Sequence, residues 1–368
     1  DEARTFGMEA LFRQFGIYAH SGQLYEPVDS EMFLYYREAK DGQIIEEGIT
    51  EAGSMASLIA AGTAHSSHGV NLIPFFIYYS MFGFQRIGDL IWAAGDMRCR
   101  GFLLGGTAGR TTLAGEGLQH QDGNSHLFAL AYPNLQAYDP AYAYEMAVVV
   151  LDGMKRMYYE GEDIFYYITL MNENYEMPIL PLGSTDGILR GIYRLSERDL
   201  GANKPKVQLF GSGAILRESL RAQDILETKF GVGSNVYSVT SYKALYHDGR
   251  DCDRFNRLHP KEKPRVPYVT QTLAGAGGPV IAALDYVSAL GQAISPWVGP
   301  DYVVLGADGF GRSEARKELR RFFEVDAENI ALAALGELAR QGKYPKTKLS
   351  QAIKTLELDP DKPNPITR

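Results

Sequence analysis

The sequence has few cysteines, no long apolar run and no excess of basic residues, and each shortage excludes a class of protein. Its two cysteines, Cys99 and Cys252, fit no CxxC pattern, so a disulfide scaffold is excluded and a reducing cytoplasm is expected. No apolar run approaches the roughly 20 residues that cross a bilayer, so no membrane partner is expected. The net charge of −8 argues against a general nucleic-acid binder.

A dedicated metal site is also missing from the sequence pattern. His65 and His68 have a spacing that could ligate zinc, but no thiolate or further ligand lies near them. What is present describes an ordinary globular protein, with 45% hydrophobic and 22% charged residues. A length of 368 residues allows two or three domains and a sizeable core.

Segments rich in β-branched and aromatic residues alternate with segments of helical pattern. This alternation predicts α/β domains with parallel sheets. A helix is predicted from Asp139, as N-cap, and Pro140, in the first turn, to about Tyr158. The predicted strands are 72–79, 101–105, 164–170, 207–213, 236–240, 280–284 and 302–306, and further helices are predicted at 215–230, 313–323 and 327–341.

One stretch interrupts the alternation. Residues 178–203 carry Pro, Gly, Ser and Asp with little periodicity, which is typical of a connection between domains. We therefore expect a first domain over 1–180, a linker over 181–203 and a second domain over 204–368.

Glu51 is the most informative single residue. It stands at the head of a segment of small residues that runs to Ala64, with Thr50 as a predicted N-cap. The helix dipole favours a carboxylate in this first turn by about 0.3–1 kcal/mol. Burial among Ile49, Met55 and Leu58 would act in the opposite sense and favour the protonated form. A plain first-turn glutamate is the alternative interpretation.

Six strings of the sequence resemble one enzyme family. They are similar to the homodimeric bacterial type of pyruvate dehydrogenase, the decarboxylating first component of the pyruvate dehydrogenase complex. Their length makes the resemblance specific, and it extends over nearly the whole chain. The strings are DEARTFGME at 1–9, GITEAG at 48–53, YYSMFGFQRIGD at 78–89, GRTTLAGEGLQH at 109–120, YDPAYAYE at 138–145 and DGFGRS at 308–313.

The resemblance implies a transketolase-like fold with two parallel-sheet α/β domains, a pyrimidine-binding domain and a C-terminal domain. It also implies the cofactors thiamin diphosphate and magnesium. The family's diphosphate-binding domain, whose Gly-Asp-Gly…Asn motif holds the metal, has no counterpart here, so magnesium ligands are expected outside this chain. The chain opens at Asp1 without a methionine, and we expect it to be a C-terminal part of a longer protein, inactive alone.

By resemblance, Glu51 hydrogen-bonds the aminopyrimidine of thiamin diphosphate. The cofactor's own amino group becomes basic only when a protein acid shares a proton with the opposite ring nitrogen. If burial dominates, Glu51 can share that proton near neutral pH. Ile49, next to it, is expected to contact the cofactor.

The aromatic run 75–84 supplies further candidates. Such runs usually fill a core, but Tyr79 and Phe82 lie where the predicted strand ends, and ligands of parallel sheets collect at the carboxyl ends of strands. By resemblance, Phe82 packs on the aminopyrimidine and Tyr79 lies near the bound intermediate.

His120 lies in a polar, Gly-rich loop at 115–123. A loop histidine is commonly a hydrogen-bonded turn residue, but it also suits a proton donor or anion binder near neutral pH. By resemblance, His120 is catalytic and faces the carboxylate of pyruvate, and Glu2 is a family acid at the substrate end. The family commonly has a second histidine where this chain has Asn124, so Asn124 receives no role and His126 is interpreted as structural.

The resemblance as a whole implies oxidative decarboxylation of pyruvate, with transfer of the acetyl unit to the lipoyl domain of dihydrolipoyl acetyltransferase. It also implies a homodimer with sites between subunits, and a loop at 21–29 that orders over the site. Two alternatives remain open. One is a transketolase-like or other 2-oxo acid enzyme that uses thiamin diphosphate; the other is a non-catalytic fragment for dimerisation or complex assembly.

Overall fold

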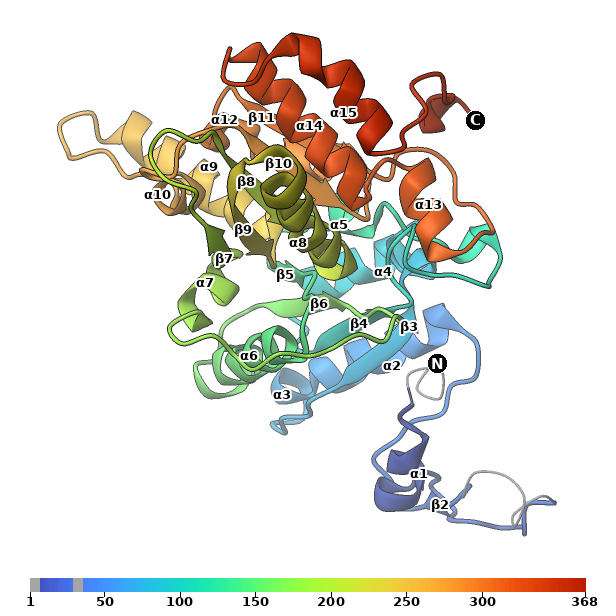
Figure 1. Ribbon diagram of the computed structural model, residues 1–368. Helices are drawn as coiled ribbons and strands as arrows, with labels where there is room; N and C mark the ends of the chain where they lie inside the picture. Colours follow the sequence, from blue (N-terminus) through green and yellow to red (C-terminus); the bar gives the residue numbers. More distant parts are fainter. Residues whose placement is uncertain (1–6, 29–35) are drawn as a thin grey trace.

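The computed structural model describes residues 7–28 and 36–368, which form two α/β domains and an N-terminal arm (Figure 1). The expected residue Glu2 lies outside this described part, as does the end of the loop expected at 21–29. No helix among the described residues is both long and apolar enough to cross a bilayer.

The first sheet has four parallel strands in the order β3-β4-β6-β5. Its strands carry aromatic and branched residues, and β4 and β6 are buried throughout, as expected for a parallel sheet covered on both faces. The four strands are β3 (Phe75–Tyr79), β4 (Phe102–Gly106), β5 (Leu135–Tyr138) and β6 (Phe165–Thr169).

Helices cover both faces of this sheet. Met55 and Leu58 of α2 (Glu51–Gly62) and Ile91 of α4 (Phe84–Asp96) share one core with Phe76 and Tyr78 of β3. On the other face, α6 (Ala143–Met154) and the π-helical turn η3 (Lys155–Tyr159) pack on the alternate strand residues. The remaining helices of this part are α3 (Ala64–Ser67) and α5 (Ser125–Ala129).

The second sheet has five strands in the order β11-β10-β8-β9-β7. Four are parallel, and the edge strand β7 runs antiparallel to β9. The strands are β7 (Ile192–Arg198), β8 (Lys206–Gly211), β9 (Gly233–Val239), β10 (Val280–Leu284) and β11 (Tyr302–Gly306). Since α7 (Thr185–Arg190) and β7 both lie within 181–203, the stretch expected as a linker contains regular structure, and β7 belongs to the second sheet.

The second sheet is covered by helices α8 (Leu216–Ile225), continued by the π-helical η5 (Leu226–Phe230), and α14 (Ala327–Arg340) on one face. Helices α9 (Tyr242–Leu258) and α10 (Tyr268–Thr272) cover the other face. Shorter helices are η4 (Gly213–Ile215), α11 (Ser288–Gln292), α12 (Ser295–Val298), α13 (Arg316–Phe322), η6 (Lys346–Lys348), α15 (Leu349–Thr355) and η7 (Pro365–Thr367).

The predicted start of the helix after β5 is wrong. Helix α6 begins at Ala143, and the carboxylate of Glu145 accepts hydrogen bonds from the backbone N–H groups of Ala141, at 2.6 Å, and Tyr142, at 3.1 Å. Asp139 is instead buried, and its carboxylate accepts hydrogen bonds from the Thr169 and Tyr286 hydroxyls, at 2.6 and 3.0 Å. Asp139 therefore does not cap α6, because its carboxylate is held by Thr169 and by Tyr286 of the second domain.

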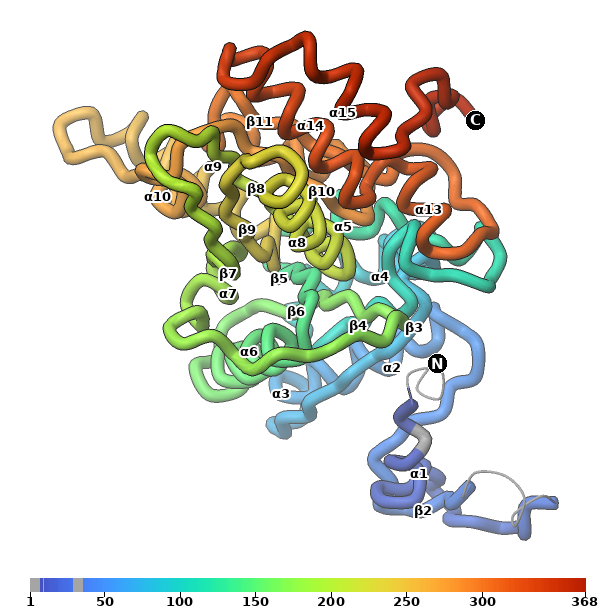
Figure 2. Tube along the Cα trace, viewed as in Figure 1, coloured from blue at the N-terminus to red at the C-terminus, as the bar shows by residue number. Residues whose placement is uncertain are grey.

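The N-terminal arm extends away from the two domains (Figure 2). It carries α1 (Glu9–Phe15) and two short parallel strands, β1 (Ile17–Tyr18) and β2 (Glu38–Ala39). After the arm, the chain enters the first domain at α2, whose first residue is Glu51.

Candidate active site at the strand ends of the first sheet

Three predicted residues meet beyond the carboxyl ends of β3 and β4. Tyr79 ends β3, Phe82 lies in the 3-10 turn η1 (Ser80–Phe82), and His120 lies in the 3-10 turn η2 (Leu118–His120). The His120 ring centroid lies 5.2 Å from that of Tyr79 and 5.2 Å from that of Phe82, while Tyr79 and Phe82 are 6.1 Å apart. All three pairs have edge-to-face geometry, which is the favoured arrangement of aromatic rings.

Glu51 joins this group through an arginine. The guanidinium of Arg86 donates a hydrogen bond of 2.9 Å to Oε1 of Glu51 and lies 4.2 Å from the centroid of the Phe82 ring. Glu51 is 7% exposed, whereas the Arg86 side chain is 53% exposed. Sequence analysis did not single out Arg86, since the pairing joins residues 35 positions apart and no local pattern signals it.

The predicted environment of Glu51 is only partly correct. Thr50 is the N-cap, and its hydroxyl accepts a hydrogen bond of 3.3 Å from the Gly53 N–H. Met55 and Leu58 are buried, as expected. The prediction that Ile49 buries the carboxylate is wrong, because Ile49 is 84% exposed. Arg86 also places a cation beside the Glu51 carboxylate, which the sequence did not indicate.

The carboxylate of Glu116 lies near the imidazole of His120 but does not hydrogen-bond to it. Nδ1 of the imidazole lies 3.9 Å from Oε2 of Glu116, four residues earlier in the same loop. This separation is longer than a hydrogen bond, and Nδ1 has no hydrogen-bond partner among the described residues. The imidazole is therefore held mainly by ring contacts and by its backbone.

The neighbouring polar residues have different surroundings. His126 is buried and its Nε2 lies 3.0 Å from the Thr169 hydroxyl, and burial lowers the pKa of His126 to about 4. Asn124 is half-buried, with its side-chain oxygen 3.5 Å from Nη2 of Arg110. Among the described residues, no three His, Cys, Asp or Glu side chains gather in a way that could hold a metal ion.

These residues fit a flat nitrogen heterocycle. A buried carboxylate can accept or share a proton with a ring nitrogen, and an aromatic side chain beside it can pack on the ring face. Parallel α/β sheets bind ligands at the carboxyl ends of their strands, and the group made by Glu51, Phe82, Tyr79 and His120 lies at such an edge.

Comparison with solved structures identifies the fold. Transketolase from Leishmania mexicana aligns with a TM-score of 0.62 and 20% identity, over 92% of this chain and 44% of that one. A structure described as a split gene transketolase, inactive beta4 tetramer, aligns with a TM-score of 0.59 and 17% identity, over 92% of this chain and 97% of that one. The transketolase-like fold expected from the sequence is confirmed.

Sequence comparison is more specific. Residues 1–178 match the model of the pyruvate dehydrogenase E1 component middle domain, and residues 191–326 match that of the transketolase-like C-terminal domain. Proteins named pyruvate dehydrogenase E1 component are 55% identical in Cupriavidus necator, over 100% of this chain, and 55% identical in Escherichia coli K12, over 99%. The chain spans 41% of the length of each of these relatives. It belongs to the pyruvate dehydrogenase E1 component family, of which it carries the middle and C-terminal domains.

Proposed function

We propose that this chain supplies the pyrimidine side of a thiamin diphosphate site that decarboxylates pyruvate oxidatively. The acetyl unit would pass to the lipoyl group of dihydrolipoyl acetyltransferase within a pyruvate dehydrogenase complex of the cytoplasm. The observation that carries the proposal is the buried carboxylate of Glu51, linked through Arg86 to the Phe82 ring in the turn that follows β3.

Each residue of the group has a role in this proposal. When bound, thiamin diphosphate supplies the carbanion that attacks the ketone of pyruvate. Glu51 shares a proton with the ring nitrogen of the aminopyrimidine, and Phe82 packs on that ring. Tyr79 lines the substrate side, and His120 donates a proton to an oxygen of the substrate. Ile49 is proposed to contact the cofactor through its exposed side chain, and Glu2, which lies outside the described residues, to be a catalytic acid.

The site needs parts that this chain does not contribute. We propose that magnesium and the diphosphate are bound by an upstream domain, and that the working enzyme is a homodimer in which the two domains of one site come from different subunits. The share of the relatives' length that the chain spans, 41%, supports this proposal. So does the similarity to the split gene transketolase structure, which covers 97% of a chain described as an inactive tetramer.

The test uses a full-length chain, defined as this chain joined to the upstream part that its relatives carry. We expect Glu51→Gln to lower the rate of pyruvate decarboxylation by about 10²–10⁴-fold, the range typical of a lost acid–base group. The matched control is Asp89→Asn, which neutralises an exposed carboxylate on α4 and should leave the rate unchanged. Unchanged decarboxylation in Glu51→Gln would contradict the proposed mechanism.

Calorimetric titration separates catalysis from assembly. Thiamin diphosphate with magnesium should bind the full-length homodimer and show little heat with the present chain alone. Absence of binding in both proteins would favour the reading of this chain as an assembly fragment. Turnover of sugar phosphates in place of pyruvate would favour a transketolase-like activity.

A further inference from the structure

The loop that follows β4, residues 107–121 with η2 included, is attached to the second domain at its end by Gln121. The Gln121 side chain is 1% exposed. Its Nε2 donates hydrogen bonds to the Arg312 carbonyl, at 2.8 Å, and to the Leu113 carbonyl, at 2.9 Å. Its Oε1 accepts a hydrogen bond of 2.6 Å from the Arg312 N–H. One side chain thus pairs with both backbone groups of a residue 191 positions away.

The contact surface on the second domain is shaped for Gln121. A Cβ atom on Gly311 would lie 2.6 Å from the Leu118 carbonyl oxygen and 2.7 Å from Oε1 of Gln121. Real Cβ atoms do not approach other heavy atoms this closely, so only glycine lets the two backbones pack at this distance. The stretch 308–313, for which the sequence predicted no role, therefore contains the surface on which this loop packs.

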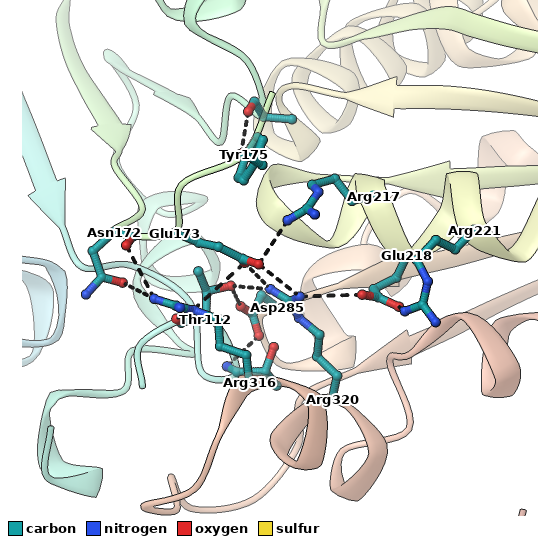
Figure 3. Close-up of polar contacts among 12 residues, drawn as sticks. Thr112, Asn172, Glu173, Tyr175, Arg217, Glu218, Arg221, Asp285, Arg316 and Arg320 are labelled. Atoms are coloured by element: carbon teal, nitrogen blue, oxygen red, sulfur yellow. Dashed lines mark hydrogen bonds and ion pairs between the residues drawn. The ribbon is translucent and has the colours of Figure 1, made fainter. Parts of the chain in front are cut away.

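Other side chains hold the start of the same loop. The Asp285 carboxylate, just after β10, accepts hydrogen bonds from the Thr111 N–H, at 2.7 Å, and from the Thr112 hydroxyl, at 2.5 Å. Arg110 donates a hydrogen bond of 2.6 Å to the Ala307 carbonyl, and Arg316 donates one of 2.6 Å to the Thr112 carbonyl. Figure 3 shows Arg316 and Asp285 converging on Thr112. The loop is thus attached to the second domain at both ends.

His120 directly precedes Gln121 and has few polar restraints of its own. Its ring meets Tyr79 and Phe82 edge to face, and Glu116 lies beyond hydrogen-bond range. Ring-edge contacts fix orientation weakly, whereas three hydrogen bonds to a buried amide fix the adjacent backbone. The backbone that carries the imidazole is therefore anchored to the second domain through Gln121.

We infer that Gln121 is a positioning residue for the reaction, and that the second domain acts as the frame that aims His120 at the substrate. The inference rests on the proposed function of His120. It gives the second domain a role in the active site, because a misplacement of about 1 Å can lower a rate by about 10²-fold.

A double-mutant cycle in the full-length homodimer tests the inference. We expect Gln121→Ala to lower kcat/KM for pyruvate by about 10- to 100-fold when His120 is present. In a His120→Ala background the same substitution should have no further effect, because contacting residues are not additive. Gln119→Ala, an exposed glutamine of the same loop, is the matched control and should behave as the unchanged enzyme.

Two results would overturn the inference. One is an undiminished effect of Gln121→Ala in the His120→Ala background, which would indicate general destabilisation. The other is a normal kcat/KM in Gln121→Ala. Failure of the proposed function is distinguishable, because Glu51→Gln reports on it independently.

Amide hydrogen exchange gives a readout that does not depend on turnover. In the cofactor-free homodimer, amides 113–121 should exchange faster in Gln121→Ala than in the unchanged protein. If Gln121→Ala does not fold, Gly311→Val, which pushes on the same amide from the second domain, replaces it in both measurements. Unchanged exchange in the folded variant would also contradict the inference.

Discussion

The carboxyl ends of the strands differ between the two sheets, although both sheets are mainly parallel. Tyr79 ends β3 of the first sheet and Phe82 follows it, and both are half-buried aromatic side chains that meet His120. After β10 in the second sheet comes Asp285, which is fully engaged with the loop 107–121. The first edge presents groups that can bind a ligand, and the second presents groups that hold the first in place.

This difference shows how one architectural position serves two purposes. The edge where ligands usually bind is used in the second domain to dock the first domain. Substitutions at the first edge should therefore lower activity and hardly change stability. Substitutions at the second edge should lower the free energy of unfolding.

The largest effect on stability is expected from Arg320, a buried member of an ion-pair network that joins the two domains (Figure 3). Its guanidinium pairs with Glu173, which follows β6, and with Glu218 of α8, at 3.4 Å. Burial alone would raise the pKa of Glu173, but Arg320, Arg217 and Arg316 outweigh it, and this pKa lies below its usual value.

Arg320→Met should lower the free energy of unfolding by about 3–5 kcal/mol, because it removes the buried cation that Glu173 and Glu218 share. Denaturant titration at neutral pH measures the change. Since the pKa of Glu173 is depressed, its contribution to stability is present above the usual carboxyl pKa and is lost as pH falls through the folded value. A stability loss below about 1 kcal/mol would remove the distinction between the two edges.

A smaller and pH-dependent effect is expected at Asp139, where the two domains meet. Burial, with a smaller contribution from the charge of Asp285, raises the pKa of Asp139 from 3.8 to about 7, against hydrogen bonds from Thr169, Tyr286 and Ser212. The folded state therefore binds the proton more tightly than the unfolded chain, and the stability gained at low pH is lost as pH rises from about 4 to about 7.

Asp139→Asn should remove this loss, since asparagine is neutral and keeps an acceptor for the Thr169 and Tyr286 hydroxyls. Relative to the unchanged protein, the variant should gain roughly 2–4 kcal/mol between pH 4 and pH 8, at about 1.4 kcal/mol for each pKa unit. Unfolding titrations at both pH values measure the difference. A gap that is constant with pH would contradict the prediction.

At the first edge, Phe82→Ala should weaken binding of thiamin diphosphate to the full-length chain by about tenfold. The reason is that the substitution removes a ring contact of about 0.5–1.5 kcal/mol together with apolar surface. Calorimetric titration measures the affinity. The midpoint of thermal unfolding without cofactor should shift little, because the Phe82 side chain is half-buried; a large shift would assign Phe82 to the core.

The smallest effect is expected from an exposed ion pair remote from both edges. Arg98 and Asp163 lie 3.5 Å apart, with side chains 72% and 47% exposed. Arg98→Ala should change the free energy of unfolding by less than about 1 kcal/mol, and denaturant titration beside Arg320→Met makes the contrast direct. A comparable loss in the two variants would show that burial does not distinguish these pairs.

Much of the fold was predictable because its strands are short runs of branched and aromatic residues between turn residues. The predicted strands and helices overlap β3, β4, β6 and β8 to β11, together with α6, α8, α13 and α14. Helices α4 and α9 were not predicted. Glycines 88 and 95 interrupt the pattern of α4, and α9 is highly charged. Strand β7 was also missed, and its residues were assigned to the linker. The strand forms by pairing with the distant β9, which no local pattern indicates.

The sequence by itself determined that Tyr79 and Phe82 lie at a strand end and that Glu51 begins a helix, and its resemblance to a known family added His120 as a candidate. Only the tertiary structure decided the partners of these residues. Arg86 reaches Glu51 across 35 positions and Gln121 reaches Arg312 across 191. Local patterns specify helices, strands and caps, because those interactions join near neighbours. Contacts between residues far apart in sequence depend on how helices and sheets pack against one another. No spacing along the chain specifies which of these side chains come together.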